Sequence, residues 1–450
     1  MSVRLGPARK NSVPIHCVDR AAFAVLGDAL DAPSRRWLQT TGFVGAGDSH
    51  ALLPASDGSL GSVWAGVRSA SDPWALASLP KLLPAGAYHL GDAGLALDAA
   101  AAALSWELGS YHFDLYTPAR REPAELTLAS GDAALQALIV AAAMASTRDL
   151  VNTPAEHMGP AALAEAVKLV ARQHGARFKQ TVGDDLLKAG FPAVHAVGRA
   201  ADAASGRAPR MIEMNWGQAG HPLLTLVGKG ADGMRWMKKD MGGAANALGL
   251  AQMIMALKLP LRLQLLLPAV ENAIAGNAFR PGDVFKTRKG LHIEIGNTDA
   301  EGRVILCDAL AYGAESQPDL MIDLATLTGA ARVALGPQLP ALFTRDTKQA
   351  RALVDLGLQL QDPLWHMPLW APYHAGIESD IADIVNTGRG PAGGAISAAL
   401  FLEDFVPAAQ DWLHIDLFAW NDVARPGRPV GGEAQTLRTL LAYLQLRYSA

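Results

Sequence analysis

From about residue 148 onward, short apolar runs alternate with helical patterns, and this alternation limits the folds that the chain can adopt. The strand-like runs are MIEMNW, LLTLVGKG, LRLQLLLPAV, LHIEIGN, LMIDLATLTG and WLHIDLFAW. The helical stretches between them include LAEAVKLVARQHG, which ends in a glycine cap, GGAANALGLAQMIMALK and GRVILCDALAYGAE. Strands that alternate with helices predict a mostly parallel sheet flanked by helices. In such sheets, ligands bind at the carboxyl ends of the strands.

The chain is too long for one ordinary core, since it has 450 residues, half of them hydrophobic. We expect an α/β protein with a smaller N-terminal α/β domain at 1–130 and a large catalytic domain at 131–450. The polar segment 119–126 lies beside a proline and is a plausible boundary. The alanine-rich residues 131–147 are expected to form a helix that bridges the two domains.

Composition excludes several classes of protein. The net charge of -4 provides no electrostatic reason for nucleic-acid binding. The only two cysteines, Cys17 and Cys307, cannot build a disulfide framework or a cysteine-based zinc site, so we expect them to be reduced and packed in the core. The N-terminus lacks the apolar core of a signal peptide, and the apolar run 133–145 is too short to span a bilayer. We therefore expect a cytoplasmic protein without a membrane partner.

Residues 294–306 read EIGNTDAEGRVIL and place two acids and an arginine at alternate positions. In an extended chain Asp299, Glu301 and Arg303 would share one face. Two carboxylates this close repel one another unless a cation lies between them, and carboxylate oxygens suit Mg, Mn or Zn. Arg303 stays charged and can hold an anion beside the metal. The alternative is a solvated turn with a local Glu–Arg pair.

Lys229 and Asp240 are both expected near strand ends, where a sheet of this type presents active-site groups. The alternative for Lys229 is an ordinary salt bridge with a carboxylate. Gly228, Gly230 and Gly233 also form a G-x-G-x-x-G pattern. As a dinucleotide motif this is weak, because no acid follows at the distance expected for a ribose contact.

Other common catalytic motifs are absent from the sequence: there is no H-E-x-x-H, no G-x-S-x-G and no Walker loop. The 12 histidines are scattered singly. His195, His292 and His414 lie inside apolar runs, so we expect them to be core or surface residues and not metal ligands.

NTDAEGR together with Lys229, KKDMGG at 238–243 and DLATLTGA at 323–330 closely resembles the leucyl aminopeptidase family of di-metal peptidases. The resemblance covers essentially all of residues 148–450, whereas the N-terminal part resembles the family only loosely. It implies a metal-dependent aminopeptidase that releases leucine-like and other residues from the free N-terminus of peptides. It also implies a cytoplasmic homohexamer and two divalent ions per subunit, Mn or Zn, with Mg and Co as alternatives.

The resemblance assigns roles to individual residues. A bicarbonate ion is expected at Arg303, where it acts as the base for the attacking water. The metal ligands are expected to be Lys229, Asp240, Asp299 and Glu301. The pocket for the first side chain of the peptide is expected to be lined by Met237, Thr326 and Gly329.

The chain departs from the family directly after Gly230. Family members carry an additional loop there, with an aspartate that bridges both metals and a lysine that stabilises the tetrahedral intermediate, whereas here Gly230 runs straight into Ala231. Asp232 is a candidate substitute for the bridging aspartate. The alternative function is a weakly active or non-catalytic relative with an assembly or DNA-binding role on the same scaffold.

Overall fold

The computed structural model describes residues 2–118, 122, 124–232, 237–388, 390 and 392–448. The chain divides into two compact units. The first comprises Met1–Ala145 and Asp422–Val430, and the second comprises Ser146–Asn421 and Gly431–Ala450. The boundary falls within the long helix α5 (Asp132–Asn152). Nothing in the sequence pattern indicated that a segment near the C-terminus belongs to the first unit.

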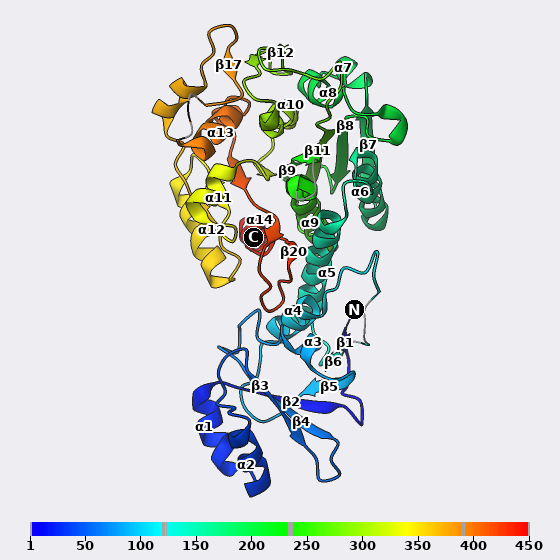
Figure 1. Cartoon of the computed structure of the whole chain (residues 1–450), viewed down its shortest axis with the longest axis vertical. Helices are drawn as coiled ribbons and strands as arrows, with labels where there is room; N and C mark the ends of the chain where they lie inside the picture. The colour runs from blue at the N-terminus through cyan, green and yellow to red at the C-terminus, as the bar shows by residue number, and fades with distance from the viewer. Residues whose placement is uncertain are drawn as a thin grey trace. The chain divides into compact units, whose positions relative to one another are not determined.

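The first unit is built on a six-stranded sheet with the strand order β1-β6-β5-β2-β4-β3 (Figure 1). All neighbouring strands are parallel except β3 and β4. Val18, Leu38, Phe43 and Trp64 form the centre of one core cluster. The elements up to the boundary helix are β1 (Val3–Leu5), β2 (Val13–Val18), α1 (Arg20–Ala29), α2 (Ala32–Thr40), β3 (His50–Pro54), β4 (Leu60–Gly66), α3 (Leu79–Leu82), β5 (Gly86–Leu90), α4 (Ala99–Ser110) and β6 (Ala124–Leu128).

The second unit is built on a nine-stranded sheet with the order β16-β15-β18-β14-β9-β11-β8-β7, and β10 also pairs with β11. Its centre, β18-β14-β9-β11, is parallel, and antiparallel pairs occur toward both edges. The predicted α/β class is confirmed, with a mixed sheet whose middle is parallel.

The strands of the second unit are β7 (Arg177–Val182), β8 (Arg210–Trp216), β9 (Leu223–Gly228), β10 (Gly230–Asp232), β11 (Arg262–Glu271), β12 (Val284–Lys286), β13 (His292–Glu294), β14 (Leu320–Ala325), β15 (Ala341–Phe343), β16 (Trp365–His366), β17 (Ile384–Val385), β18 (Trp412–Asp416), β19 (Trp420–Asn421) and β20 (Gly431–Gly432). Its helices are α6 (Pro160–His174), α7 (Asp185–Lys188), α8 (Pro192–Gly198), η1 (Ala203–Ser205), η2 (Met237–Met241), α9 (Gly242–Ala256), η3 (Thr298–Ala300), α10 (Glu301–Glu315), α11 (Gly329–Leu335), α12 (Thr347–Gln359), η4 (Ala371–Ile377), α13 (Gly394–Glu403) and α14 (Leu437–Tyr448).

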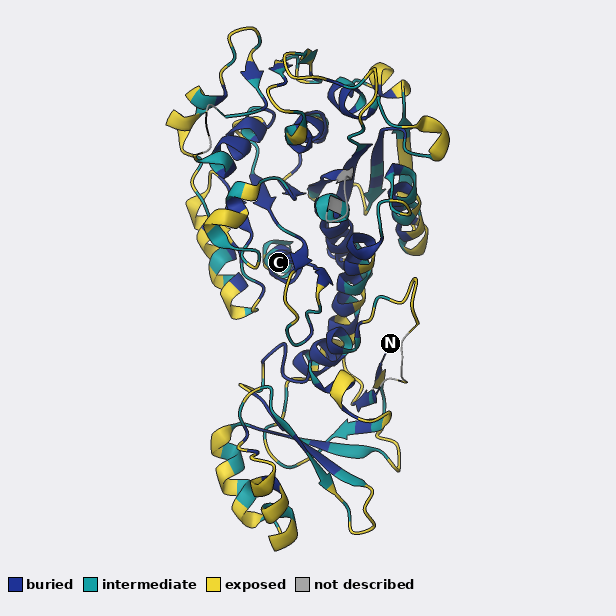
Figure 2. Ribbon diagram, in the orientation of Figure 1, coloured by how far each residue is buried: buried dark blue, intermediate teal, exposed yellow. Residues whose placement is uncertain are grey.

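Helices cover both faces of this sheet. A Cβ at Gly228 of β9 would meet α9, whereas Thr225 of the same strand contacts α10. Side chains an odd number of positions apart on a strand point to opposite faces, so α9 and α10 lie on opposite sides of the sheet. Figure 2 shows α9 buried along its length, while α1 and α2 of the first unit are largely exposed. An all-round apolar helix such as α9 belongs in the interior of a large domain.

Most of the predicted elements are present, with one strand displaced. The glycine cap is confirmed, because Gly175 ends α6 in the left-handed conformation with φ of 66°. The run LHIEIGN was expected to be a buried strand of the main sheet. Instead, only His292–Glu294 is a strand, and it pairs with β12 and β17 in a separate three-stranded sheet. Both cysteines are free and buried, as predicted.

The apolar run 133–145 is the first part of α5, which has 21 residues. The expectation that this segment is too short to cross a membrane is therefore wrong, because the helix continues to Asn152. Among the described residues, α5 is the one helix long and apolar enough for a membrane span by length and composition, but 61% of its apolar window is buried inside the protein. Such burial is typical of a core helix.

Candidate active site

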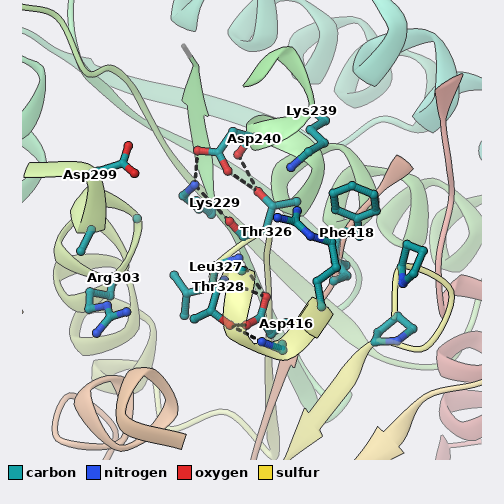
Figure 3. Close-up of a pocket in the computed structure, with 18 of the residues that line it drawn as sticks. Lys229, Lys239, Asp240, Asp299, Arg303, Thr326, Leu327, Thr328, Asp416 and Phe418 are labelled. Carbon is teal, nitrogen blue, oxygen red and sulfur yellow. Dashed lines mark hydrogen bonds and ion pairs between the residues drawn. The ribbon is translucent and has the colours of Figure 1, made fainter. Parts of the chain in front are cut away.

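A cavity of about 240 Å³ lies where β9, β14 and β18 end (Figure 3). The residues to which the resemblance assigned a role all line it except Met237, whose side chain lies outside the part of the chain that the structure describes. The side chain of Asp232 and all of Gly233 also lie outside the described part of the chain. The predicted residues that line the cavity are Lys229, Asp240, Asp299, Glu301, Arg303, Thr326 and Gly329.

Lys229 is held at the carboxyl end of β9 by its backbone. Its N–H donates to the carbonyl oxygen of Leu324 at 3.1 Å, and its carbonyl accepts from Ala244 at 2.9 Å. The side chain is 3% exposed. A Cβ at position 302 would overlap the Lys229 stem, so only glycine lets the start of α10 approach this closely. The lysine is thus clamped between β14, α9 and α10.

The Lys229 ammonium lies between two carboxylates. It contacts Asp240 directly, lies 3.4 Å from Oε1 of Glu301, and donates to the carbonyl oxygen of Thr326 at 3.2 Å. Thr326 Oγ1 in turn donates to Asp240 Oδ1 at 2.8 Å. Lys229 therefore forms the salt bridge with a carboxylate that was the alternative from the sequence. The arrangement also places an amine and two carboxylates within reach of one another.

Asp299 and Glu301 are not arranged as the alternating pattern predicted. Asp299 lies in the short helix η3 and Glu301 is the first residue of α10, so the segment is helical and not extended. Residues two apart on a helix do not face each other. Glu301 is buried against Lys229, whereas Asp299 is exposed, and Figure 3 draws it apart from the Lys229–Asp240 contact. The shared face was wrong, although both side chains line the same cavity.

Burial controls the ionisation of this cluster. Loss of hydration raises the pKa of Glu301 to about 7, against the lowering influence of Lys229 and with added repulsion from Asp240 and Asp299. Burial lowers the pKa of Lys229, but Asp240 and Glu301 more than offset this, so its pKa is raised. A cation is thus strongly favoured at this position, and here the ammonium provides it.

Arg303 lies on α10 with its guanidinium buried beside the cavity. Its Nε has no hydrogen-bond partner among the described residues, and its Cζ lies 5.9 Å from the ring centroid of Phe401. Burial lowers its pKa to about 10, although Asp416 and Glu301 favour the charged form. A buried cation with an unused donor suits a bound anion.

Among the other residues that line the cavity, four have charged or aromatic side chains that the sequence patterns did not single out. Asp416 ends β18 and accepts hydrogen bonds from the N–H groups of Leu327 and Thr328, at 2.9 and 3.2 Å. It therefore fixes the loop that leads into α11. The others are Lys239, Arg332 and Phe418. Asp416 follows an apolar run, so the same strand-end argument that selected Lys229 was available for it.

The residues present suit a divalent cation. Carboxylate oxygens and an amine nitrogen are donors for such ions. The buried acid Glu301 and the half-buried acid Asp240 beside one lysine leave excess negative charge. No group of three or more His, Cys, Asp or Glu side chains within the described residues is close enough to hold a metal. The compact donor set is therefore Lys229, Asp240 and Glu301, with Asp299 at the edge of the cavity.

The three histidines that lie in apolar runs are absent from the lining of this cavity. His195 contacts Asp184 at 3.0 Å and His292 contacts Asp383 at 3.3 Å. His414 is buried in the sheet and pairs with Asp323 at 2.6 Å. Their prediction as core or surface residues is confirmed.

Comparison with known proteins covers both units. The family model described as "Cytosol aminopeptidase family, catalytic domain" matches residues 145–441, and the model described as "M17 aminopeptidase, N-terminal domain" matches residues 13–129. The N-terminal part, expected to resemble the family only loosely, therefore also carries a match. The probable cytosol aminopeptidase of Geobacter sp. (strain M21) is 39% identical over 367 residues, which cover 75% of this chain and 73% of that protein.

Solved structures agree with these matches. The cytosol aminopeptidase from Coxiella burnetii is 44% identical, with a TM-score of 0.93 and coverage of 99% of both chains. The bottromycin maturation enzyme BotP in complex with Mn is 30% identical, with a TM-score of 0.84 and coverage of 98% of this chain and 100% of that one. None of these relatives supports a non-catalytic role. The chain belongs to the cytosol aminopeptidase family, whose members are metal-dependent aminopeptidases.

Proposed function

We propose that this chain removes leucine-like and other residues from the free N-terminus of peptides in the cavity at the ends of β9, β14 and β18. The observation that carries the proposal is the cluster of Lys229, Asp240 and Glu301, in which two carboxylates converge on one buried amine. Family membership provides the reaction class, and this cluster provides a place for it.

The proposed ligands are Lys229, Asp240, Asp299 and Glu301, which would hold two divalent ions, Mn or Zn, with Mg or Co as alternatives. BotP, a relative by structure, was solved with Mn. Bound there, the ions would polarise the peptide carbonyl and lower the pKa of a water molecule. Lys229 donates its lone pair only when it is neutral, so its proton must leave as a metal binds.

The remaining roles fall to side chains around the cluster. Arg303 would hold a bicarbonate ion through its free Nε, and that ion would accept the proton of the attacking water. Thr326 and Gly329 would contact the first side chain of the peptide, with Met237 as the third proposed contact. Thr326 also fixes the orientation of Asp240 through its hydroxyl group.

We further propose a cytoplasmic homohexamer. The names of the relatives support the cytoplasmic location. The hexamer rests on the family resemblance alone, and a monomeric elution volume at micromolar concentration in size-exclusion chromatography would contradict it.

Hydrolysis of leucine-p-nitroanilide in the presence of added Mn or Zn, alongside a metal count per subunit, tests the proposal. Metal-dependent release of nitroaniline that stops on chelation supports it. A protein that binds no metal and hydrolyses no aminoacyl substrate would refute it.

A further inference from the structure

Two cations of the cavity take no part in the roles proposed above. Lys239 comes from η2 and Arg332 from α11, and both lie against the ring of Phe418. Lys239 Nζ is 4.5 Å from the ring centroid and Arg332 Cζ is 4.6 Å from it. Figure 3 shows Lys239 and Phe418 on the side of the cavity away from Asp299 and Arg303.

Neither cation has a hydrogen-bonded or ion-paired carboxylate within the described part of the chain. Burial lowers the pKa of Lys239, and the nearby charges of Asp240 and Asp416 only partly oppose this. Apart from Phe418, Lys239 and Arg332 have no hydrogen bond or ion pair there. The nearby carboxylates are already engaged. Asp240 contacts the ammonium of Lys229 and accepts a hydrogen bond from the hydroxyl of Thr326. Asp416 accepts hydrogen bonds from two backbone N–H groups and, at 2.6 Å, from the hydroxyl of Thr328. The pair therefore has unused capacity for an anion.

The position of the pair indicates which part of a peptide it would meet. Arg332 Nη2 lies 3.7 Å from the place that a Cβ at Gly329 would occupy. Gly329 and Thr326 are the proposed contacts of the first side chain. A side chain that enters this part of the cavity would therefore end near a guanidinium and an ammonium.

We propose that Lys239 and Arg332 form an anion-recognising pair that selects peptides with aspartate or glutamate as the first residue. This inference rests on the proposed peptidase function and adds a substrate class to it. The carboxylate would accept hydrogen bonds from both cations above the edge of Phe418. Glutamine has the shape of glutamate without its charge, so the two should be distinguished by these contacts alone.

The experiment compares matched substrates and matched variants of the full chain loaded with Mn. The kcat/KM values are measured for the p-nitroanilides of glutamate, glutamine and leucine in the wild type, Lys239→Met and Arg332→Met. Lys348→Met serves as the control, because Lys348 is an exposed lysine of α12 outside the cavity. Binding constants of free L-glutamate and L-glutamine, measured by calorimetry, provide a readout that does not need turnover.

We expect the glutamate-to-glutamine ratio to fall at least about tenfold in Lys239→Met and in Arg332→Met, the loss typical of one charge-assisted hydrogen bond. The Lys348→Met ratio should stay unchanged, and in Lys239→Met and Arg332→Met the kcat/KM for leucine should fall less than that for glutamate. An equal ratio in the wild type and both variants would overturn the proposal.

Two further outcomes keep the inference separate from the peptidase assignment. If no aminoacyl substrate is hydrolysed, the peptidase function fails, while calorimetry with glutamate and glutamine still decides whether the pair binds a side-chain carboxylate. The second arm uses leucyl-alanine and its C-terminal amide. If Lys239→Met affects only the preference for the free C-terminal carboxylate, the pair reads the other end of short peptides, and the assignment to the first residue is wrong.

Discussion

Two buried carboxylates of the second unit, Asp323 and Glu301, are surrounded in opposite ways. Both oxygens of Asp323 accept short hydrogen bonds, from His414 Nδ1 at 2.6 Å and from Trp412 Nε1 at 2.7 Å. Within the residues that the structure describes, Glu301 has only distant partners, Lys229 at 3.4 Å and Asn272 Nδ2 at 3.5 Å.

The difference separates a structural acid from one that is available to a ligand. Asp323 lies inside the sheet, fully buried, and each of its oxygens accepts a short hydrogen bond. Glu301 is also buried but faces the cavity, and its contacts leave room for a shorter bond to a cation. A loosely held buried carboxylate is costly unless something else stabilises it, which makes it a marker of a binding site.

Removal of the site acids should have the largest effect. We expect Glu301→Ala and Asp299→Ala each to abolish tight metal binding and lower turnover by more than about 100-fold, since even outer-shell changes often cost 10- to 100-fold. The fold should remain, because both residues lie at helix ends and their side chains line the cavity and do not belong to the apolar core. Metal content by mass spectrometry and circular dichroism check both points.

Asp355→Ala, a change of an exposed acid on α12, is the control for that comparison. If both site variants bind as much metal as the wild type, Glu301 and Asp299 are not metal ligands.

The loop that the family carries after Gly230 should produce the next largest effect. Without its bridging aspartate and its lysine, we expect one firmly held metal, one loosely held metal, and activity at least about 100-fold below that of a relative with the loop. Insertion of a family-like loop between Gly230 and Ala231 should restore tight binding of the second metal and the activity. Two tight metals and full activity in a chain of verified mass 47.3 kDa would contradict this account, with Asp232 the first candidate for the bridge.

Asp323→Asn should affect stability and leave metal binding in place. The amide cannot accept from both His414 and Trp412, so a buried donor loses its partner and the free energy of unfolding should fall by about 3 kcal/mol. Glu301→Gln, in contrast, should leave the metal-free protein as stable as the wild type. Urea unfolding of the two variants tests this difference. An equal loss of stability in both variants would contradict the assignment of Asp323 as structural and Glu301 as a ligand.

A smaller effect concerns Asp308, whose pKa is raised to about 6, chiefly by burial. Its oxygens accept from the N–H groups of Ala193 at 2.8 Å and Arg288 at 2.8 Å. Because the folded pKa exceeds the unfolded value, its contribution to stability is present at low pH and is lost as pH rises through about 6. Between pH 5 and pH 7 we expect a loss of roughly 1 kcal/mol that Asp308→Asn removes. Urea midpoints across this range check it, and an identical pH dependence in the variant would count against it.

The sequence predicted the elements better than the local geometry of the site. Apolar periodicity located β9, β14, β18, α6 and α9, because buried strands and helices are dictated by which positions must avoid water. The same reasoning treated Asp299 to Arg303 as extended, since polar alternation reads as a strand. The segment is helical because Glu301 opens α10, whose apolar residues pack against β9 and β11.

The partners of the site residues were beyond the reach of sequence patterns. Lys239, Arg332 and Phe418 come from three segments, and only the tertiary fold brings them to one cavity. The asymmetry between Glu301 and Asp299 depends on burial, which two acids two positions apart do not reveal. Motif resemblance could supply roles for single residues but not the contacts between them.

The three compact donors come from the end of β9, the approach to α9 and the start of α10, segments that meet only in the folded chain. A cation that needs all three therefore has no site on the unfolded polypeptide. Its binding energy adds directly to the folding equilibrium, in proportion to the logarithm of free ion concentration over the dissociation constant. The supply of metal in the cell would thus set the lifetime of this protein as well as its rate of turnover.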